Sequence, residues 1–142
     1  MITEPIYTWD ADNGIATVEQ TIDNKHIKGV AKVADEDKSF ANKYTGLTIA
    51  EQRMNIDYIK QHIEYDLKPQ LFILNHLLGT MRQSPRFDPN SYEAKRIFAE
   101  RQNILDDIAS FKKLMETTRI SLRKYIEKKD IFYRTAEKGK NS

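Results

Sequence analysis

The chain of 142 residues contains no cysteine, which excludes disulfide bonds, cysteine-ligated zinc fingers and cysteine nucleophiles. Glycine and proline are scarce, with five and four residues, and no internal repeat is visible. The sequence also lacks a glycine-rich phosphate loop and a nucleophile elbow. Its three histidines are scattered: His62 and His76 are 14 residues apart, too far to share a metal, and no His-x-x-His, Glu-x-x-His or acidic constellation occurs. We therefore expect no enzyme activity, no catalytic residue, no cofactor and no metal site.

No hydrophobic run is long enough to cross a bilayer, and residues 1–5 have neither the basic nor the apolar part of a secretion signal. We expect no membrane contact and a cytoplasmic location, in a bacterium or an infected bacterial host.

The net charge of +2 conceals a strong asymmetry along the chain. Residues 1–66 carry 7 basic and 12 acidic side chains, whereas residues 109–142 carry 10 and 4. Basic residues near the C-terminus of a helix compensate its macrodipole, and this is the simpler explanation. The alternative is an anion-binding surface. Nucleic acid is disfavoured as a partner, because the strands lack the aromatic motif of RNA-binding sheets and the N-terminal part is acidic.

The first 47 residues predict a small antiparallel sheet with one solvent-exposed face. The expected strands are 6–9, 15–22 and 26–33, rich in β-branched and aromatic residues. Asn13-Gly14 and the segment 23–25 provide the turns. A charged loop at 35–38 and the aromatic residues Phe40 and Tyr44 follow. A three-stranded sheet of this kind needs helices to cover its other face.

A first helix is predicted from about 49 to 81. Thr48 and Glu51 fit a capping box at its start. Pro69 interrupts the apolar pattern, and we expect it to kink one helix rather than separate two. The apolar positions, which we call the first seam, are Ile56, Ile59, Ile63, Leu67, Leu71, Leu74, Leu78 and Met81.

A second, longer helix is predicted from Ser91 to about Thr135, capped by Ser91 or by Asp88-Pro89, with residues from Glu137 onward frayed. Its apolar positions, the long seam, repeat in heptads at Ile97, Arg101, Ile104, Ile108, Phe111, Met115, Thr118, Leu122, Tyr125, Lys129 and Phe132. Such a helix measures roughly 65 Å, more than a compact globule of this size. We therefore expect a second chain to cover the long seam.

The predicted fold class is α+β: an N-terminal antiparallel β-meander of about three strands, followed by two long antiparallel helices that form an intermolecular four-helix bundle. The expected organisation is a small β-sheet head at 1–47 and a helical hairpin for oligomerisation at 48–142, within one structural domain. The expected assembly is a homo-oligomer, either a dimer or a trimer of dimers.

Arginines and aromatic residues near the connecting loop form the best candidate ligand site, because guanidinium groups bind phosphates and aromatic rings stack on bases. These residues, which we call the turn cluster, are Arg82, Arg86, Phe87, Asn90, Tyr92 and Arg96. The alternative is an ordinary polar loop. Arg53 beside Trp9 and Tyr44 forms a second candidate, unless the aromatics only pack the sheet. Arg101 either contacts a ligand near the dimer axis, or extends its charged end to solvent, or pairs with a Glu across an interface.

Five segments carry a resemblance to known proteins: 7–10, 13–18, 47–53, 91–96 and 125–134. They resemble a group of small proteins carried by phages of Gram-positive bacteria. The layout of a β head followed by two long helices is also similar to that of the Thoeris anti-defence sponges. This similarity implies a phage anti-defence protein that sequesters an immune signal of the cyclic ADP-ribose type without cleaving it, and it supplies no site residues.

Two functions follow from these expectations. The first is a non-enzymatic phage protein that binds and sequesters a small phosphorylated nucleotide near its subunit interfaces. The alternative is a phage accessory protein that binds a host protein or assembles structurally through its coiled-coil helices.

Overall fold

Three antiparallel strands form the N-terminal part of the protein. The computed structural model describes residues 2–33 and 42–140, with side chains as far as Lys129. The strands are β1 (Ile6–Asp10), β2 (Ile15–Ile22) and β3 (Lys25–Lys32), in the order β1-β2-β3. The predicted meander is confirmed, with β3 beginning and ending one residue earlier than expected. The expected loop at 35–38 and Phe40 lie outside the described residues.

The turns follow from residues that tolerate positive φ. Gly14 has φ 64° in the first turn, where the Asp10 carboxylate accepts hydrogen bonds from the Asn13 backbone at 3.3 Å and side chain at 2.8 Å. Asp23 and Asn24, with φ of 49° and 66°, form the two-residue connection between β2 and β3. Both central residues have positive φ, as a tight hairpin with the normal strand twist requires.

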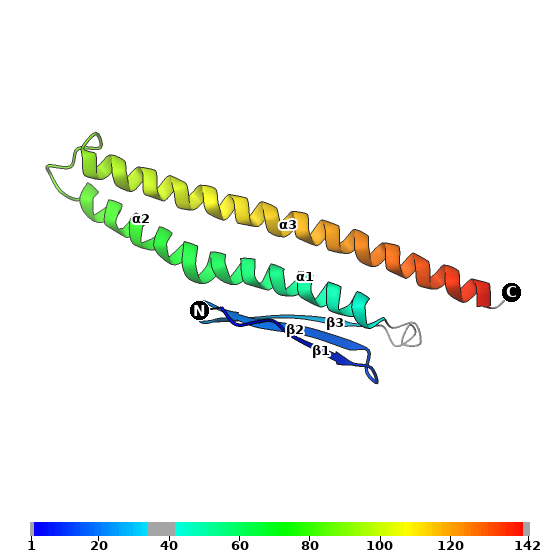
Figure 1. Ribbon diagram of the computed structural model, residues 1–142. Helices are drawn as coiled ribbons and strands as arrows, with labels where there is room; N and C mark the ends of the chain where they lie inside the picture. The colour runs from blue at the N-terminus through cyan, green and yellow to red at the C-terminus, as the bar shows by residue number, and fades with distance from the viewer. Residues whose placement is uncertain (1, 34–41, 141–142) are drawn as a thin grey trace. The chain divides into compact units, whose positions relative to one another are not determined.

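Helix α1 (Lys43–His62) lies along one face of this sheet, and the core of the head forms between them (Figure 1). Alternate residues of β2 and β3 face the helix, as the period of two in a strand dictates. The buried residues of this core are Ala16, Val18, Ile27, Ala31, Ala50 and Met54. Trp9 packs against it and supports the interpretation as sheet packing, whereas Tyr44 is exposed and does not.

The start of α1 differs from the prediction. The helix begins at Lys43, because the Asn42 side chain accepts hydrogen bonds from the backbone N–H groups of Tyr44 (2.8 Å) and Thr45 (3.2 Å). The capping box at Thr48 is therefore wrong. The Thr48 hydroxyl instead donates to the Tyr44 carbonyl, one turn back within the helix.

A single π-helical turn, η2 (Ile63–Leu67), connects α1 to α2 (Lys68–Arg82), so the helix passes Pro69 without a break. The Lys68 N–H donates to the Ile63 carbonyl, five residues back. The first seam here advances by three successive steps of four residues. Each such step rotates an apolar stripe by about 40° around an α-helix. A wider π turn rotates the stripe back, so the two halves of the first seam remain on one face.

Helix α3 (Tyr92–Lys140) is the long C-terminal helix, and the Ser91 hydroxyl caps it by accepting the Ala94 N–H at 3.3 Å. Every position of the long seam from Ile97 to Lys129 is buried or half-buried, which confirms the heptad assignment there. Phe132 lies beyond the described side chains. The helix continues to Lys140, past the predicted end near Thr135 and through the residues expected to fray.

The described chain separates into two compact units. One contains residues 1–58 and 115–142, and the other contains residues 59–114. The second unit is a helical hairpin, in which η2 and α2 run antiparallel to the first part of α3 (Figure 1). We call residues 59–114 the hairpin. The division falls within α1 and α3 rather than at residue 47.

Inside the hairpin the two seams face each other, so Ile104 and Ile108 are buried within one chain. His62 also lies between the two helices, where the centre of its ring is 4.9 Å from that of Phe111 on α3. Its Nδ1 lies 2.7 Å from the Asp66 carboxylate. The expectation that these seam residues need a second chain is wrong, because the chain's own helix covers them. The fold is α+β, as predicted.

Candidate functional site

The turn between α2 and α3 carries the predicted turn cluster. Its backbone is held by short-range hydrogen bonds: Ser84 N–H to the Met81 carbonyl, and Phe87 N–H to the Ser84 carbonyl, both at 3.1 Å. The Asp88 carboxylate accepts the Asn90 N–H at 2.9 Å, as an Asx turn does. The turn is thus a defined structure that links the two helices.

Two arginines of the turn cluster already have partners within the hairpin. The Arg82 guanidinium lies 5.8 Å from the centre of the Phe98 ring. Arg96 Nε donates to Glu100, one turn along α3, at 3.2 Å. The Glu100 carboxylate offsets the charge of Arg96, whereas the contact with the neutral Phe98 ring orients Arg82 and leaves its charge unchanged.

A cavity of about 320 Å³ opens at the turn, and only Arg86 and Phe87 of the turn cluster line it. The remaining lining residues are Met81, Ser84, Asp88, Ser91 and Glu93. One guanidinium therefore shares the cavity with two carboxylates. Nearby like charges repel a phosphate, so this lining weakens the case for a pyrophosphate ligand.

The other two candidate arginines are used in the fold. Arg101 Nε donates to Asn75 Oδ1 on α2 at 2.6 Å, so its partner is an amide of its own chain rather than a Glu across an interface. Arg53 belongs to the head, where its guanidinium donates to the Val30 carbonyl at 2.7 Å.

The contact of Arg53 has a structural reason that sequence reasoning missed. Asp57, one turn further along α1, accepts the Lys28 N–H at 3.0 Å. Both contacts reach β3, which is an edge strand of the sheet. Unpaired edge groups are aggregation sites unless they are covered. Two helix side chains four residues apart protect this edge, so Arg53 has a structural role in the head.

A second surface on the hairpin was not predicted. It is a continuous, uncharged helix face opposite the first seam, and we call it the outer face. It consists of Tyr65, Pro69, Phe72, Ile73, His76, Leu77 and Thr80. Their spacing of three, four and one places them on one side of the helix.

Large apolar side chains dominate the outer face. Tyr65, Phe72 and Ile73 are 66%, 72% and 63% exposed, and Leu77 is 43% exposed. The Phe72 and His76 rings stack with centres 6.5 Å apart. The Thr80 hydroxyl donates to the His76 carbonyl at 3.1 Å, so the helix itself satisfies this polar group. An exposed apolar patch of this kind marks an interaction site more often than a single exposed residue does.

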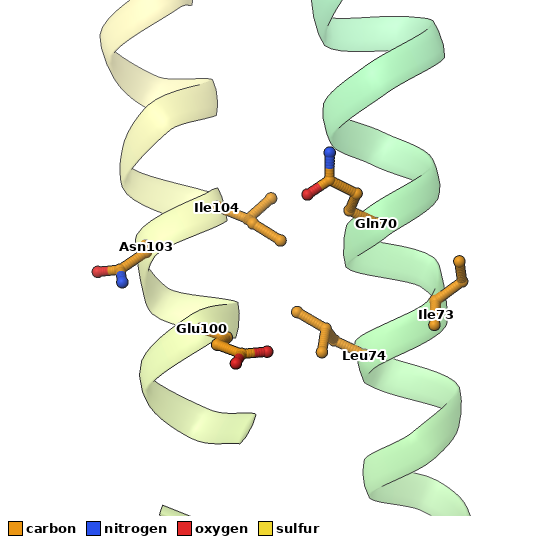
Figure 2. A pocket seen from close by; sticks show the side chains of 6 residues that line it. All are labelled: Gln70, Ile73, Leu74, Glu100, Asn103 and Ile104. Carbon is orange, nitrogen blue, oxygen red and sulfur yellow. The ribbon is translucent and has the colours of Figure 1, made fainter. Parts of the chain in front are cut away.

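A groove is lined by residues of α2 and α3 (Figure 2), and one of them, Ile73, also belongs to the outer face. Its volume is about 350 Å³. Leu74 and Ile104 point toward each other across it, and polar side chains of both helices lie at its margin. The polar residues are Gln70, Glu100 and Asn103. The apolar floor suits an apolar side chain of a partner, and the margin carries two amides and the Glu100 carboxylate.

No group of three or more metal-ligating side chains occurs among the residues that the structure describes. Within the same residues, no helix is both long and apolar enough to cross a membrane. Comparison with protein families, curated proteins and solved structures found no match to this chain.

Proposed function

We propose that the chain is a non-enzymatic binding protein that acts through its helical hairpin, by holding another protein surface rather than by transforming a substrate. The observation that carries this proposal is the outer face, where four large apolar side chains remain exposed on one uncharged helix face. Burying this surface against a protein releases ordered water and supplies the main favourable term of association.

One form of this association is a four-helix assembly of two hairpins. Since the two seams face each other inside each hairpin, such an assembly uses the outer faces of α2, rather than the seams packed around one common core. The resemblance to phage proteins suggests the other form, in which a host protein occupies the same face of an accessory protein.

A combined mass and capture experiment tests the proposal. Purified wild-type protein and a Tyr65→Ser/Leu77→Ser variant are examined by light scattering and used as bait in lysate of a Gram-positive host. We expect the wild type to hold either a second copy or one stoichiometric partner, and the variant to release it. A wild-type chain that stays monomeric and captures nothing contradicts the proposal.

Sequestration of a small phosphorylated nucleotide, such as a cyclic ADP-ribose signal, is the second candidate function. The favouring observation is that Arg86 and Phe87 line one cavity beside two serines. A guanidinium and an aromatic ring are the groups that bind a phosphate and a base. The similarity in layout to anti-defence sponges points to the same ligand class.

Calorimetry with cyclic ADP-ribose variants and cyclic dinucleotides tests this second function. Heating the complex and recovering the intact ligand distinguishes sequestration from cleavage. Arg86→Gln should abolish binding, whereas the control Arg123→Gln, an exposed arginine on α3 outside the turn, should not. Absence of a binding signal with every ligand removes this candidate.

A further inference from the structure

We infer that the partner of the outer face is the outer face of a second copy of this chain, so that two hairpins associate through α2. This inference rests on the proposed function and specifies which partner covers the outer face. Three features of the described hairpin support a second copy over a different protein: the area available, the charge of the face, and the groove beside it.

The area is sufficient for a symmetric pair. The exposed fractions of Tyr65, Phe72, Ile73 and Leu77 correspond to about 500 Å² of accessible surface on one copy, given that a large aromatic side chain buries about 150–250 Å². Two copies would together bury about 1,000 Å², which is near the lower limit for a specific interface. The other three residues of the outer face add to this area.

The charge of the outer face favours self-association. In a two-fold dimer the same patch is used twice, so a charged patch would meet its own charge. None of the seven positions is Asp, Glu, Lys or Arg, although 31% of the chain is charged. Glu64 and Lys68, which flank Tyr65 and Pro69 in the chain, form an ion pair of 2.8 Å with each other. A partner recognised by its charge would find no complementary group on this face.

The groove gives the surface a hollow beside its projections. Phe72 and Ile73 protrude, and the groove lined by Ile73, Leu74 and Ile104 lies on the flank of the same helix. A surface that carries both projections and a hollow can pack against a copy of itself. The expected assembly is therefore a row of helices in which α2 meets α2, with each α3 on the outside.

Sedimentation equilibrium and light scattering of the full chain test this inference. We expect the wild type to have twice the 16.6 kDa mass of one chain. The Phe72→Ser/Ile73→Ser variant should weaken the dimer at least about a hundredfold, since buried aromatic residues dominate interface energies. The control is Tyr44→Ser, a residue of the head that is 76% exposed, and it should leave the dimer unchanged.

The outcomes separate this inference from the proposed function. Because Phe72 and Ile73 are exposed, the double variant should retain the helical circular dichroism of the wild type. A dimer that persists in the double variant overturns the inference. A monomeric wild type that holds a stoichiometric host protein through Phe72 also overturns it, but leaves the proposed function intact. A monomeric wild type that holds nothing overturns both.

Discussion

Gly29→Ala should detach α1 from the sheet. Gly29 lies on β3 opposite Val18, on the side that faces the helix. A Cβ atom at this position would overlap the Ala50 carbonyl oxygen and the Met54 amide nitrogen, and would lie 2.9 Å from the Ala50 carbonyl carbon. All three atoms belong to the backbone of α1, so no side-chain rotation can relieve the overlap. The helix as a whole must move.

The loss of stability can be estimated from what must move to make room for the methyl group. Overpacking a core by one methyl group typically costs about 1–3 kcal/mol when side chains can adjust. Here only backbone can move, and a gap of about 0.5–1 Å forfeits a quarter to a half of each dispersion contact across the interface. We therefore expect a loss of at least about 3 kcal/mol in the free energy of unfolding of the head. With a urea m-value of about 2 kcal/mol/M, the midpoint falls by about 1.5 M.

Urea denaturation followed by tryptophan fluorescence measures this loss. Trp9 is the single tryptophan of the chain and packs against the head core, so its emission reports on the head. Gly79→Ala is the matched control, since no atom lies within 4 Å of a Cβ built there. In the interior of α2 this change should stabilise the hairpin by about 1 kcal/mol and leave the Trp9 transition unchanged. If Gly29→Ala unfolds at the wild-type midpoint, α1 does not pack on β3 as closely as described.

Three further changes test contacts within each unit: the core of the hairpin, the β3 edge of the head and the cap of α1. Ile108→Asp places a charge at a buried position and should destabilise the hairpin by at least about 4 kcal/mol in thermal unfolding, whereas Ala109→Asp on the exposed side should change it by less than about 1 kcal/mol. Arg53→Ala removes an exposed hydrogen bond to the β3 edge, so the free energy of unfolding of the head, followed by Trp9 fluorescence, should fall by about 1 kcal/mol at most. Asn42→Ala removes the α1 cap and should cost the head about 1 kcal/mol, and an unchanged midpoint would argue against that cap.

The strands and long helices could be predicted because their patterns are long and repeated. The alternation in β2 and β3 and the heptads of the long seam each involve many residues, so one unusual residue does not hide them. The start of α1 could not be predicted, since Gly46 interrupts the pattern there. The helix nevertheless has a packing reason for glycine at this position. A Cβ atom on residue 46 would lie only 3.1 Å from the Ala16 Cβ and 3.2 Å from the Trp9 ring, which is tighter than ordinary contact.

The candidate site was predicted less well than the fold. The residues of the turn cluster lie around the connecting turn, and the i,i+4 spacing of Arg96 and Glu100 is visible in the sequence. The partners of Arg101 and Arg53 lie far away in the chain, so sequence alone does not show them. The outer face does not belong to the apolar stripe that predicts the first helix. Phe72 and Ile73 lie outside that stripe, and a second set of apolar positions on the same helix is the signal that reveals them.

The π turn at Ile63–Leu67 has an evolutionary consequence. A π turn is equivalent to one residue inserted into an α-helix, absorbed locally without disturbing the turns on either side. Removing one residue here, such as the exposed Glu64, would restore ordinary helical hydrogen bonding and keep α2 in register with α3. Homologues of this chain should therefore accept a single-residue gap at this point, in the middle of a helix, where alignments ordinarily forbid one.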